Sequence, residues 1–406
     1  MCKILGIIAE YNPFHNGHLF HLEESKKRCN ANYTIAVMSG NFTQRGEPAI
    51  VDKWTRAHMA ICNGIDLVIE LPTFYSISSA ENFAEGAIKI LSSLNIVDYI
   101  SFGTESSNLE KLCDIAHVLY SEPQLYKSIL HVELNKGLSF PKARNNALIT
   151  YFDDITITEI INSPNNILAI EYIKSIYKLN SSITPICIQR EKVGYNQLST
   201  SGNFASASAI RDLIINNSCD LDKYLPASSY RLLKNNIDND MLLKDLSVFD
   251  SIITYKLRTM SLDELREVPD ISEGLEYKIK QAANLYNTTY DILSFIKSKR
   301  YTLTRLKRIL LYILLNITKY DMQTAKSITP YIRVLGFNRK GKEILSQISK
   351  YNSNIITSTK KFIECNSDTH LNSLIQKDIE ATNIYTIGCK ANPCANLDFT
   401  KKIITI

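Results

Sequence analysis

The stretch EYNPFHNGHLFHLEESKK, Glu10 to Lys27, marks the point where an apolar, strand-like run gives way to helical periodicity. It holds three of the seven histidines in the chain, His15, His18 and His21. Histidines three residues apart share one face of a helix and point toward its amino-terminal end. Free backbone N–H groups at that end attract anions, and Gly17 allows a ligand to approach closely. The stretch therefore predicts a phosphate site at a strand-to-helix turn, although incidental surface or core histidines would also fit an isolated pair.

Strand-like runs alternate with helical patterns throughout the first half of the chain. Each of the runs KILGIIAEY, YTIAVMSG, DLVIEL and YISFGT is followed by a segment with helical spacing of apolar residues. This alternation predicts βαβ units, a parallel sheet buried on both faces and an α/β, Rossmann-like fold. Ligands of such sheets bind at the carboxyl ends of the strands, which is where the histidines lie.

The pattern becomes mostly helical after the Asn-, Asp- and Ser-rich stretch INNSCDLDKYLPASS. A length of 406 residues suits two domains. We predict a catalytic domain over residues 1–216 and a mainly helical domain over residues 217–406. The runs IYTIG and FTKKIITI near the end predict a small β-hairpin.

Composition narrows the class of protein. An apolar fraction of 45% with 21% charged residues is typical of a globular protein. The runs LGIIA and LLYILLNI are too short for a signal peptide or a membrane span. We therefore expect a cytoplasmic location, and nine scattered cysteines indicate reduced thiols rather than disulfides. The close pair Cys389 and Cys394 lacks neighbouring ligands, so we predict no metal site.

Basic residues are concentrated between Phe295 and Lys342, although the net charge of the chain is only +5. This segment has twelve Lys and Arg residues and one acidic residue, Asp321. A solvated helix surface would have this composition, and so would a face that binds a polyanion through its phosphates.

A second motif supports the phosphate site. The run SASAIR, Ser206 to Arg211, follows the last predicted strand, TPICIQRE, and opens a helix. HNGH resembles the HxGH signature of the nucleotidyltransferases, and SASAIR resembles their second phosphate-binding motif. The runs EYNPFHNGHL, MSGNFTQRGEPA, DLVIELP, SFGTES, SPNNILAIEY and RVLGFNRKG resemble the tRNA(Met) cytidine acetate ligase family over most of the chain.

The resemblance implies an ATP-dependent ligase that makes acetyladenylate and acetylates N4 of the wobble cytidine of elongator tRNA(Met). It implies ATP as co-substrate, with Mg²⁺ arriving on the triphosphate. Nothing in composition or spacing identifies acetate. Two other classes remain open: an adenylyl- or cytidylyltransferase that makes a small cofactor, and a nonenzymatic RNA-binding protein. The basic segment disfavours the first, and the two intact motifs disfavour the second.

The resemblance also implies site residues. His15, His18 and Arg211 would stabilise the departing pyrophosphate. The ATP-binding set is Ile8, Ala9, Glu10, Tyr11, Asn12, Pro13, Phe14, His15, Asn16, Gly17, His18, Leu19, Gly103, Asn165, Asn166, Arg190, Ser206, Ser208 and Arg211. Local structure offers plainer roles for some of them, since Gly103 could serve a turn, and the asparagines and serines could cap helices.

Two further groups are predicted. The loop GNFTQRGEPA and the helix after it supply an acetate or cytidine pocket, unless the loop is simply solvated; its residues are Asn41, Gln44, Arg45 and Glu47, followed by Lys53 and Arg56. The tRNA-binding residues implied by the resemblance are Arg300, Arg305, Arg308, Arg339 and Lys340, with Tyr301 and Phe337 as stacking surfaces.

Overall fold

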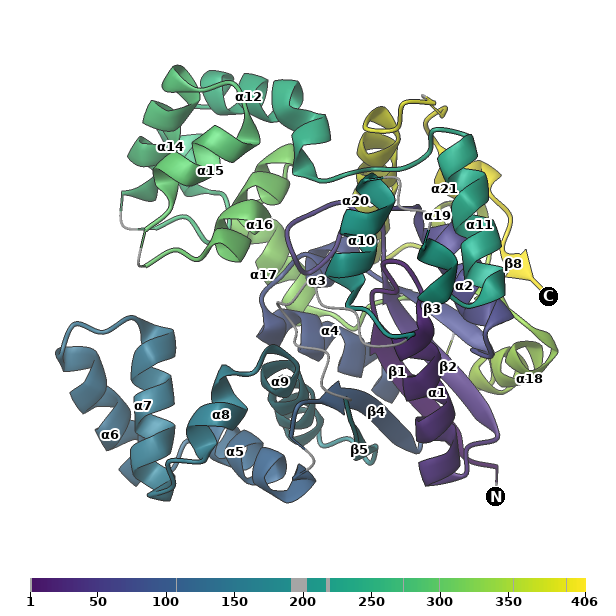
Figure 1. Ribbon diagram of the computed structural model, residues 1–406, viewed down its shortest axis with the longest axis horizontal. Coiled ribbons are helices and arrows are strands. Elements are labelled where there is room, and N and C mark those ends of the chain that lie inside the picture. Colours follow the sequence, from purple (N-terminus) through teal and green to yellow (C-terminus); the bar gives the residue numbers. More distant parts are fainter. Residues whose placement is uncertain are drawn as a thin grey trace.

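The computed structural model describes residues 2–106, 108–190, 203–216, 220–272, 274–298, 300–352, 354–391 and 393–406. At its centre is a sheet with the strand order β5-β4-β1-β2-β3-β6-β7, in which β8 also pairs with β6 (Figure 1). The strands are β1 (Ile4–Ala9), β2 (Tyr33–Ser39), β3 (Leu67–Leu71), β4 (Tyr99–Thr104), β5 (Thr184–Gln189), β6 (Ile332–Phe337), β7 (Ile355–Ile356) and β8 (Ile404–Thr405).

The strands β1 to β5 run parallel, as the alternating pattern predicts. β2 and β3 lie on one side of β1, and β4 and β5 lie on the other. The strand order therefore reverses at β1, and this switch point is where a parallel sheet opens a ligand crevice. The turn that carries HNGH follows β1 directly. The predicted α/β class is confirmed.

Helices cover both faces of the sheet because successive strand residues point to opposite sides. Ile35 and Val37 of β2 pack in the core beneath α4, α5, α9 and α18, whereas Ala36 and Met38 pack beneath α1, α2, α10 and α11. The helices of the first half are α1 (Asn16–Cys29), α2 (Lys53–Cys62), α3 (Thr73–Ser76), α4 (Ala80–Ser93), α5 (Leu109–Ser121), α6 (Gln124–Asn135), α7 (Phe140–Phe152), α8 (Ile157–Asn162), α9 (Pro164–Lys178) and α10 (Ala207–Ile215).

The later region is mainly helical, and Figure 1 shows α12, α14, α15 and α16 gathered in one lobe. Its core includes Phe42, Phe74 and Ile77 from the first half of the chain, so the lobe packs onto the loop after β2 and onto α3. The elements are α11 (Ala227–Asp238), α12 (Asp250–Thr259), α13 (Leu262–Arg266), α14 (Leu275–Leu285), α15 (Thr289–Ile296), α16 (Leu303–Leu314), α17 (Lys319–Ser327), α18 (Arg339–Ile348), α19 (Thr359–Cys365), α20 (Thr369–Ile387) and α21 (Leu397–Thr400), with short 3₁₀ turns η1 (Leu221–Lys223) and η2 (Leu246–Phe249).

The chain then returns to the sheet. β6 pairs antiparallel with β3, and β7 and β8 pair with β6. The segment 217–406 therefore adds strands to the sheet of the first half. The predicted C-terminal hairpin is wrong, because the run IYTIG ends α20 and β8 pairs with β6 instead. Tyr385 is buried in α20, where its hydroxyl donates to the backbone oxygen of Ala49 at 2.8 Å, so tertiary packing holds this run as a helix.

No helix in the described part of the chain is long and apolar enough to cross a membrane.

Candidate active site

A cavity opens at the carboxyl ends of β1, β4 and β5, at the switch point of the sheet. The first helical turns of α1, α9 and α10 contribute to its wall. The predicted residues that line it are Ile8, Ala9, Glu10, Tyr11, Asn12, His15, Gly17, His18, Gln44, Arg45, Gly103, Asn165, Arg190, Ser206, Ser208 and Arg211. The structure thus brings together both motifs that were recognised in the sequence, although residues 12 and 211 are far apart in the chain.

The histidines are fixed by the start of α1. His15 caps the helix, since its Nδ1 accepts the N–H of Gly17 at 3.0 Å. The backbone N–H of His15 donates to Nδ1 of His18 at 3.3 Å, and the two rings stack with centroids 3.8 Å apart. Both Nδ1 atoms act as acceptors, so each neutral ring carries its proton on Nε2. Each ring therefore offers an Nε2–H donor.

Burial keeps these imidazoles uncharged. It lowers the pKa of His15 to about 3, with Arg190 and Arg211 adding to the effect. The pKa of His18 is also held well below its usual value by burial and by His15. His21 is buried too, and its Nε2 lies 3.1 Å from the hydroxyl of Ser101 in β4. Before a ligand arrives, positive charge at the site therefore comes from arginines, and the histidines supply neutral hydrogen-bond donors.

The second motif places a cation beside the first. Ser206 caps α10 by accepting the N–H of Ala209 at 3.1 Å. Arg211 donates through Nη1 to the backbone oxygen of Asn12 at 3.1 Å and through Nη2 to Ser208 at 3.3 Å. The guanidinium of Arg45 also reaches Ser208, at 3.4 Å. Two helix N-termini and two guanidinium groups thus converge on one part of the cavity, which suits a polyphosphate.

The opposite part of the cavity is formed by β4, β5 and α9. Arg190 donates to the amide oxygen of Asn165 at 3.3 Å, and the amide nitrogen of Asn165 donates to Glu105 at 2.6 Å. Phe102, Leu168, Tyr172 and Ile188 give this part an apolar wall. Glu105 was not identified as a site residue from the sequence, although its position just after β4, in SFGTES, could have indicated this role.

Five predicted ATP residues do not line the cavity: Pro13, Phe14, Asn16, Leu19 and Asn166. Phe14 is fully buried in the core beside α1. The side chain of Asn16 donates to the backbone oxygens of Asn203 and Lys223, at 3.0 and 2.9 Å. Asn166 is buried, and its amide oxygen accepts the N–H of Glu105 at 3.0 Å. These asparagines brace the wall.

The loop after β2 is divided between the cavity and the interior. Gln44 and Arg45 line the cavity, whereas the side chain of Asn41 is buried against Thr382 of α20 at 3.1 Å. Lys53 and Arg56, predicted with this loop for the acetate or cytidine pocket, are fully buried and line neither cavity. Arg56 clamps the loop from behind by donating to the backbone oxygens of Glu10 at 2.7 Å and of Ser39 at 3.0 Å.

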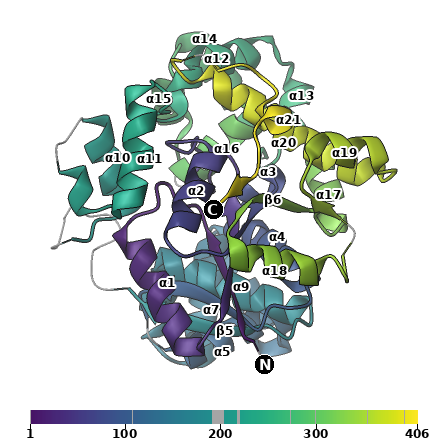
Figure 2. The same cartoon turned by 90° about the vertical axis from the view of Figure 1, so that its right-hand side faces the viewer.

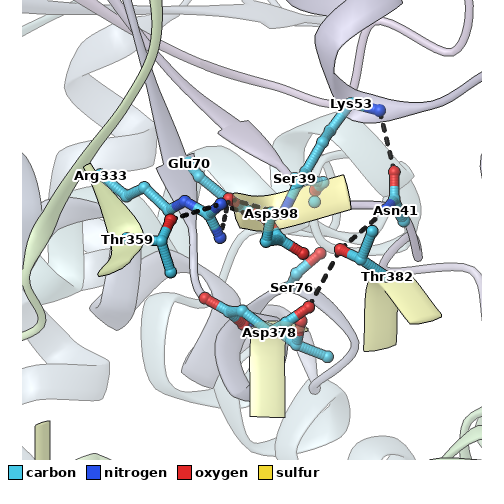
Figure 3. Close-up of polar contacts among 12 residues, drawn as sticks. Ser39, Asn41, Lys53, Glu70, Ser76, Arg333, Thr359, Asp378, Thr382 and Asp398 are labelled. Carbon is cyan, nitrogen blue, oxygen red and sulfur yellow. Dashed lines mark hydrogen bonds and ion pairs between the residues drawn. The ribbon is translucent and has the colours of Figure 1, made fainter. Parts of the chain in front are cut away.

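Lys53 belongs to a buried ion cluster beneath that loop, which Figure 3 shows at close range. Its ammonium group lies 2.7 Å from Glu70 and 2.8 Å from Asp398. Arg333 lies 3.2 Å from Glu70 and also pairs with Asp398. The cluster joins α2 and β3 to β6 and α21, which fixes the C-terminal segment against the loop that carries Arg45.

The predicted tRNA residues fall into two separate places. Arg305 and Arg308 lie on α16 beside Asp270, at 3.9 and 4.0 Å, and the side chain of Arg308 is only 11% exposed. Arg300 precedes α16. Tyr301 is buried under the guanidinium of Arg305, and Phe337 is partly buried in β6, so neither is an open stacking surface.

Arg339 and Lys340 begin α18 at the other end of the sheet. Lys340 donates to the backbone oxygen of Asn32, just before β2, at 3.1 Å, and Asn338 bonds Asp66, just before β3. These are the amino ends of strands whose carboxyl ends face the loop with Arg45. Figures 1 and 2 show α16 and α18 well apart. The basic segment is therefore not one continuous face.

A second cavity lies between α10 and α16 and shares Arg45, Ser208 and Arg211 with the first. The rest of its wall consists of Glu47, Asp212, Ile215, Lys244, Asp245, Leu303, Thr304 and Lys307. Glu47, predicted for the acetate or cytidine pocket, lies here in an ion pair with Lys307 of α16. Lys244 and Lys307 were not singled out for this site from the sequence, because only the fold brings them to Arg211.

No cluster of three or more His, Cys, Asp or Glu side chains in the described residues could hold a metal ion. Cys389 is a core residue, and burial raises the pKa of its thiol to about 12, whereas Cys394 is exposed.

The strand order, the paired motifs and the cavity between them define a nucleotidyltransferase of the HxGH type. Residues 2–398 match the model of the family described as HIGH Nucleotidyl Transferase. The chain is 47% identical over 405 residues to the tRNA(Met) cytidine acetate ligase of Thermoanaerobacter sp. (strain X514), with 99% of this chain and 100% of the relative covered. It is 45% identical over 406 residues to that of Caldanaerobacter subterraneus subsp. tengcongensis, with 100% of both covered.

Two crystal structures of Thermotoga maritima TmcAL are similar along the whole chain. The apo form gives a TM-score of 0.96 at 35% identity, covering 100% of this chain and 99% of that one. The form bound with alpha-thio ATP gives 0.93 at 34% identity, with the same coverage. The chain belongs to the tRNA(Met) cytidine acetate ligase family.

Proposed function

We propose that the protein activates acetate with ATP and transfers the acetyl group to N4 of the wobble cytidine of elongator tRNA(Met), in the cytoplasm. The observation that carries this proposal is the convergence of His15, His18 and Arg211 on one cavity at the switch point. The names of the relatives, which specify tRNA(Met), cytidine and acetate, support the substrates. The nucleotide in the Thermotoga maritima structure supports ATP.

In the activation step, an acetate oxygen attacks the α-phosphorus of ATP and pyrophosphate leaves. The protein positions the two anions and offsets the charge that develops, since the triphosphate already contains the leaving group. The Nε2–H groups of His15 and His18 donate to phosphate oxygens, and Arg211 with the start of α10 neutralises the leaving pyrophosphate. Mg²⁺ enters as part of the ATP substrate, held by phosphate oxygens and water.

In the transfer step, the cytidine approaches from the side of α16. The second cavity lies on this side and shares Arg45, Ser208 and Arg211 with the first, so a base that enters it comes close to the acetyladenylate. Arg300, Arg305 and Arg308 belong to this approach, with Arg308 the least exposed of the helix pair. Arg339 and Lys340 form a second, separate contact with tRNA, because α18 lies at the other end of the sheet.

The test is incubation with labelled acetate, ATP and total tRNA. We expect acid-stable label in one tRNA species, and N4-acetylcytidine after nuclease digestion. Labelled acetate that stays out of tRNA, together with transfer of a nucleotidyl group to a small acceptor, would instead indicate a cofactor-forming nucleotidyltransferase.

A further inference from the structure

Glu10 is the only acidic side chain among the described residues that line the main cavity. The same wall holds Arg45, Arg190 and Arg211. A carboxylate in this position repels both the triphosphate and acetate, because all of these groups are anionic. Its presence therefore weakens the binding of both substrates of the activation step. A role in a different step would explain why the cavity contains it.

The carboxylate of Glu10 is held in a fixed orientation. Glu10 directly follows β1, and its backbone oxygen accepts from Arg56 at 2.7 Å. One carboxylate oxygen, Oε1, accepts the N–H of Gln44 at 2.7 Å. These two bonds fix the residue at both its backbone and its side chain. A proton acceptor needs this kind of fixed geometry.

Glu10 also lies near the residues that the two cavities share, since its charge acts on the guanidinium of Arg211. Gln44, its partner, is followed by Arg45, which lines both cavities with Ser208 and Arg211. The second cavity has a volume of about 320 Å³ and a mostly polar wall. This volume lies within the range of about 300–1,000 Å³ that is usual for small-molecule pockets, so a single nucleotide is of a suitable size. A nucleotide that enters between α10 and α16 would bring its base toward Glu10.

We propose that the second cavity admits the target cytidine and that Glu10 accepts the proton released from its N4 amine during acetyl transfer. This inference rests on the proposed function. The N4 lone pair attacks the carbonyl carbon of acetyladenylate, and the bond between that carbon and the phosphate oxygen breaks. AMP leaves with the electron pair of the broken bond. The nitrogen, now bonded to the acetyl group, loses one proton to Glu10, which passes it to solvent.

The two steps differ in their need for a base. Acetate is already an anion at neutral pH, so its attack on ATP releases no proton. The cytosine amine is a weak nucleophile because its lone pair is delocalised into the ring, and its adduct becomes acidic as the new bond forms. A positioned carboxylate can take up that proton and contributes about 10²–10⁴-fold to the rate of such a step.

The test compares Glu10→Gln with Glu10→Asp in the full-length enzyme. Gln keeps the length of the side chain and an oxygen that can accept the Gln44 N–H, but it cannot take up a proton. Asp keeps the carboxylate but is one methylene shorter. We would measure acetate-dependent ATP–pyrophosphate exchange and acetyl transfer to tRNA on the same preparation of each variant.

We expect Glu10→Gln to lower the ratio of transfer to exchange by about 10²-fold or more, and Glu10→Asp to lower it less. A purely structural role predicts the reverse order, since Gln preserves the shape of the side chain and Asp does not. Equal losses of exchange and transfer in Glu10→Gln would overturn the proposal, because Glu10 would then serve ATP activation. Wild-type levels of both activities in Glu10→Gln would overturn it as well, because Glu10 would then serve neither step.

The wild-type enzyme separates this inference from the proposed function. If the wild type does not acetylate tRNA, the proposed function is wrong and this inference falls with it. If the wild type acetylates tRNA and Glu10→Gln keeps the same ratio, only the role of Glu10 is wrong.

Discussion

Replacing Asp378 with Asn is expected to remove a pH dependence of stability that arises because this carboxyl is buried beside Glu70 of the ion cluster. Asp378 lies in α20, where one carboxylate oxygen accepts the backbone N–H of Thr73 at 2.7 Å and the other accepts from the hydroxyl of Tyr331. Burial and the nearby charge of Glu70 raise the pKa of Asp378 from 3.8 to about 6. The folded protein therefore binds this proton more tightly than the unfolded chain does, although the carboxyl is mostly ionised again at pH 7.

The magnitude follows from the pKa shift. Raising the pKa from 3.8 to about 6 corresponds to about 3 kcal/mol between the two protonation states. Because the pKa is raised on folding, the folded state binds the extra proton between about pH 4 and pH 6. This contribution to stability is fully present below the unfolded pKa and is lost as pH rises through the folded pKa. Asn resembles the protonated form at every pH, so Asp378→Asn should lose this slope.

The assay is urea unfolding of wild type and Asp378→Asn at intervals from pH 4 to pH 8, comparing the free energies of unfolding. As pH rises across this range, the free energy of unfolding of the wild type should fall by about 3 kcal/mol relative to that of the variant. Asp398→Asn is the matched control. Burial alone would raise the pKa of Asp398, but the charges of Lys53 and Arg333 outweigh burial and lower it to about 2. Removing this charge leaves two buried cations with too few partners, which costs about 3–5 kcal/mol at pH 7.

The control has the opposite pH dependence. A lowered pKa contributes stability above the unfolded pKa, and this contribution is lost as pH falls toward about 2. If Asp378→Asn keeps the wild-type slope between pH 4 and pH 8, then folding does not raise the pKa of Asp378 and the reasoning fails.

Three further outcomes are expected. His18→Ala should lower acetate-dependent ATP–pyrophosphate exchange by roughly 10²-fold, the loss of one transition-state donor; a rate within a few-fold of wild type would remove this histidine from the mechanism. Lys244→Glu combined with Arg305→Glu should weaken tRNA binding and reduce its salt slope by about one unit for each phosphate that is no longer neutralised, and an unchanged slope in a filter-binding titration would place the tRNA elsewhere. Gly46→Ala should destabilise the loop against α16, because Gly46 has a φ of +78° and an added Cβ would lie 2.5 Å from Lys307; Gly137→Ala, with a φ of +73° and open space, is the control, and equal urea midpoints would contradict this expectation.

The sequence predicted the parallel part of the fold because the signals are local. Apolar runs of strand length alternate with helical spacing, and β2 and β3 are buried on both faces, as such runs require. The phosphate site was predictable for the same reason. HNGH and SASAIR each begin a helix, and a helix start provides capping residues and free N–H groups within a few positions of the sequence.

Other site features had no local signal. Asn41, Lys53 and Arg56 read as loop and pocket residues, yet they are buried because α20, α21 and β6 cover them. Asn166 and its neighbour Asn165 are the same residue type, and only the direction of each side chain distinguishes them. Asn165 lines the cavity, whereas Asn166 is buried behind it and bonds the backbone of Glu105.

By itself, the sequence determined the five parallel strands, the two motifs at helix starts and the family to which the chain belongs. Only the tertiary structure decided that β6 pairs with β3, that Lys53, Glu70, Arg333 and Asp398 share one buried cluster, and that the basic segment divides between α16 and α18. The physical reason is the range of the interactions. Periodicity and capping act over a few residues, whereas the pairing of Leu67 with Phe337 depends on the packing of all the chain between them.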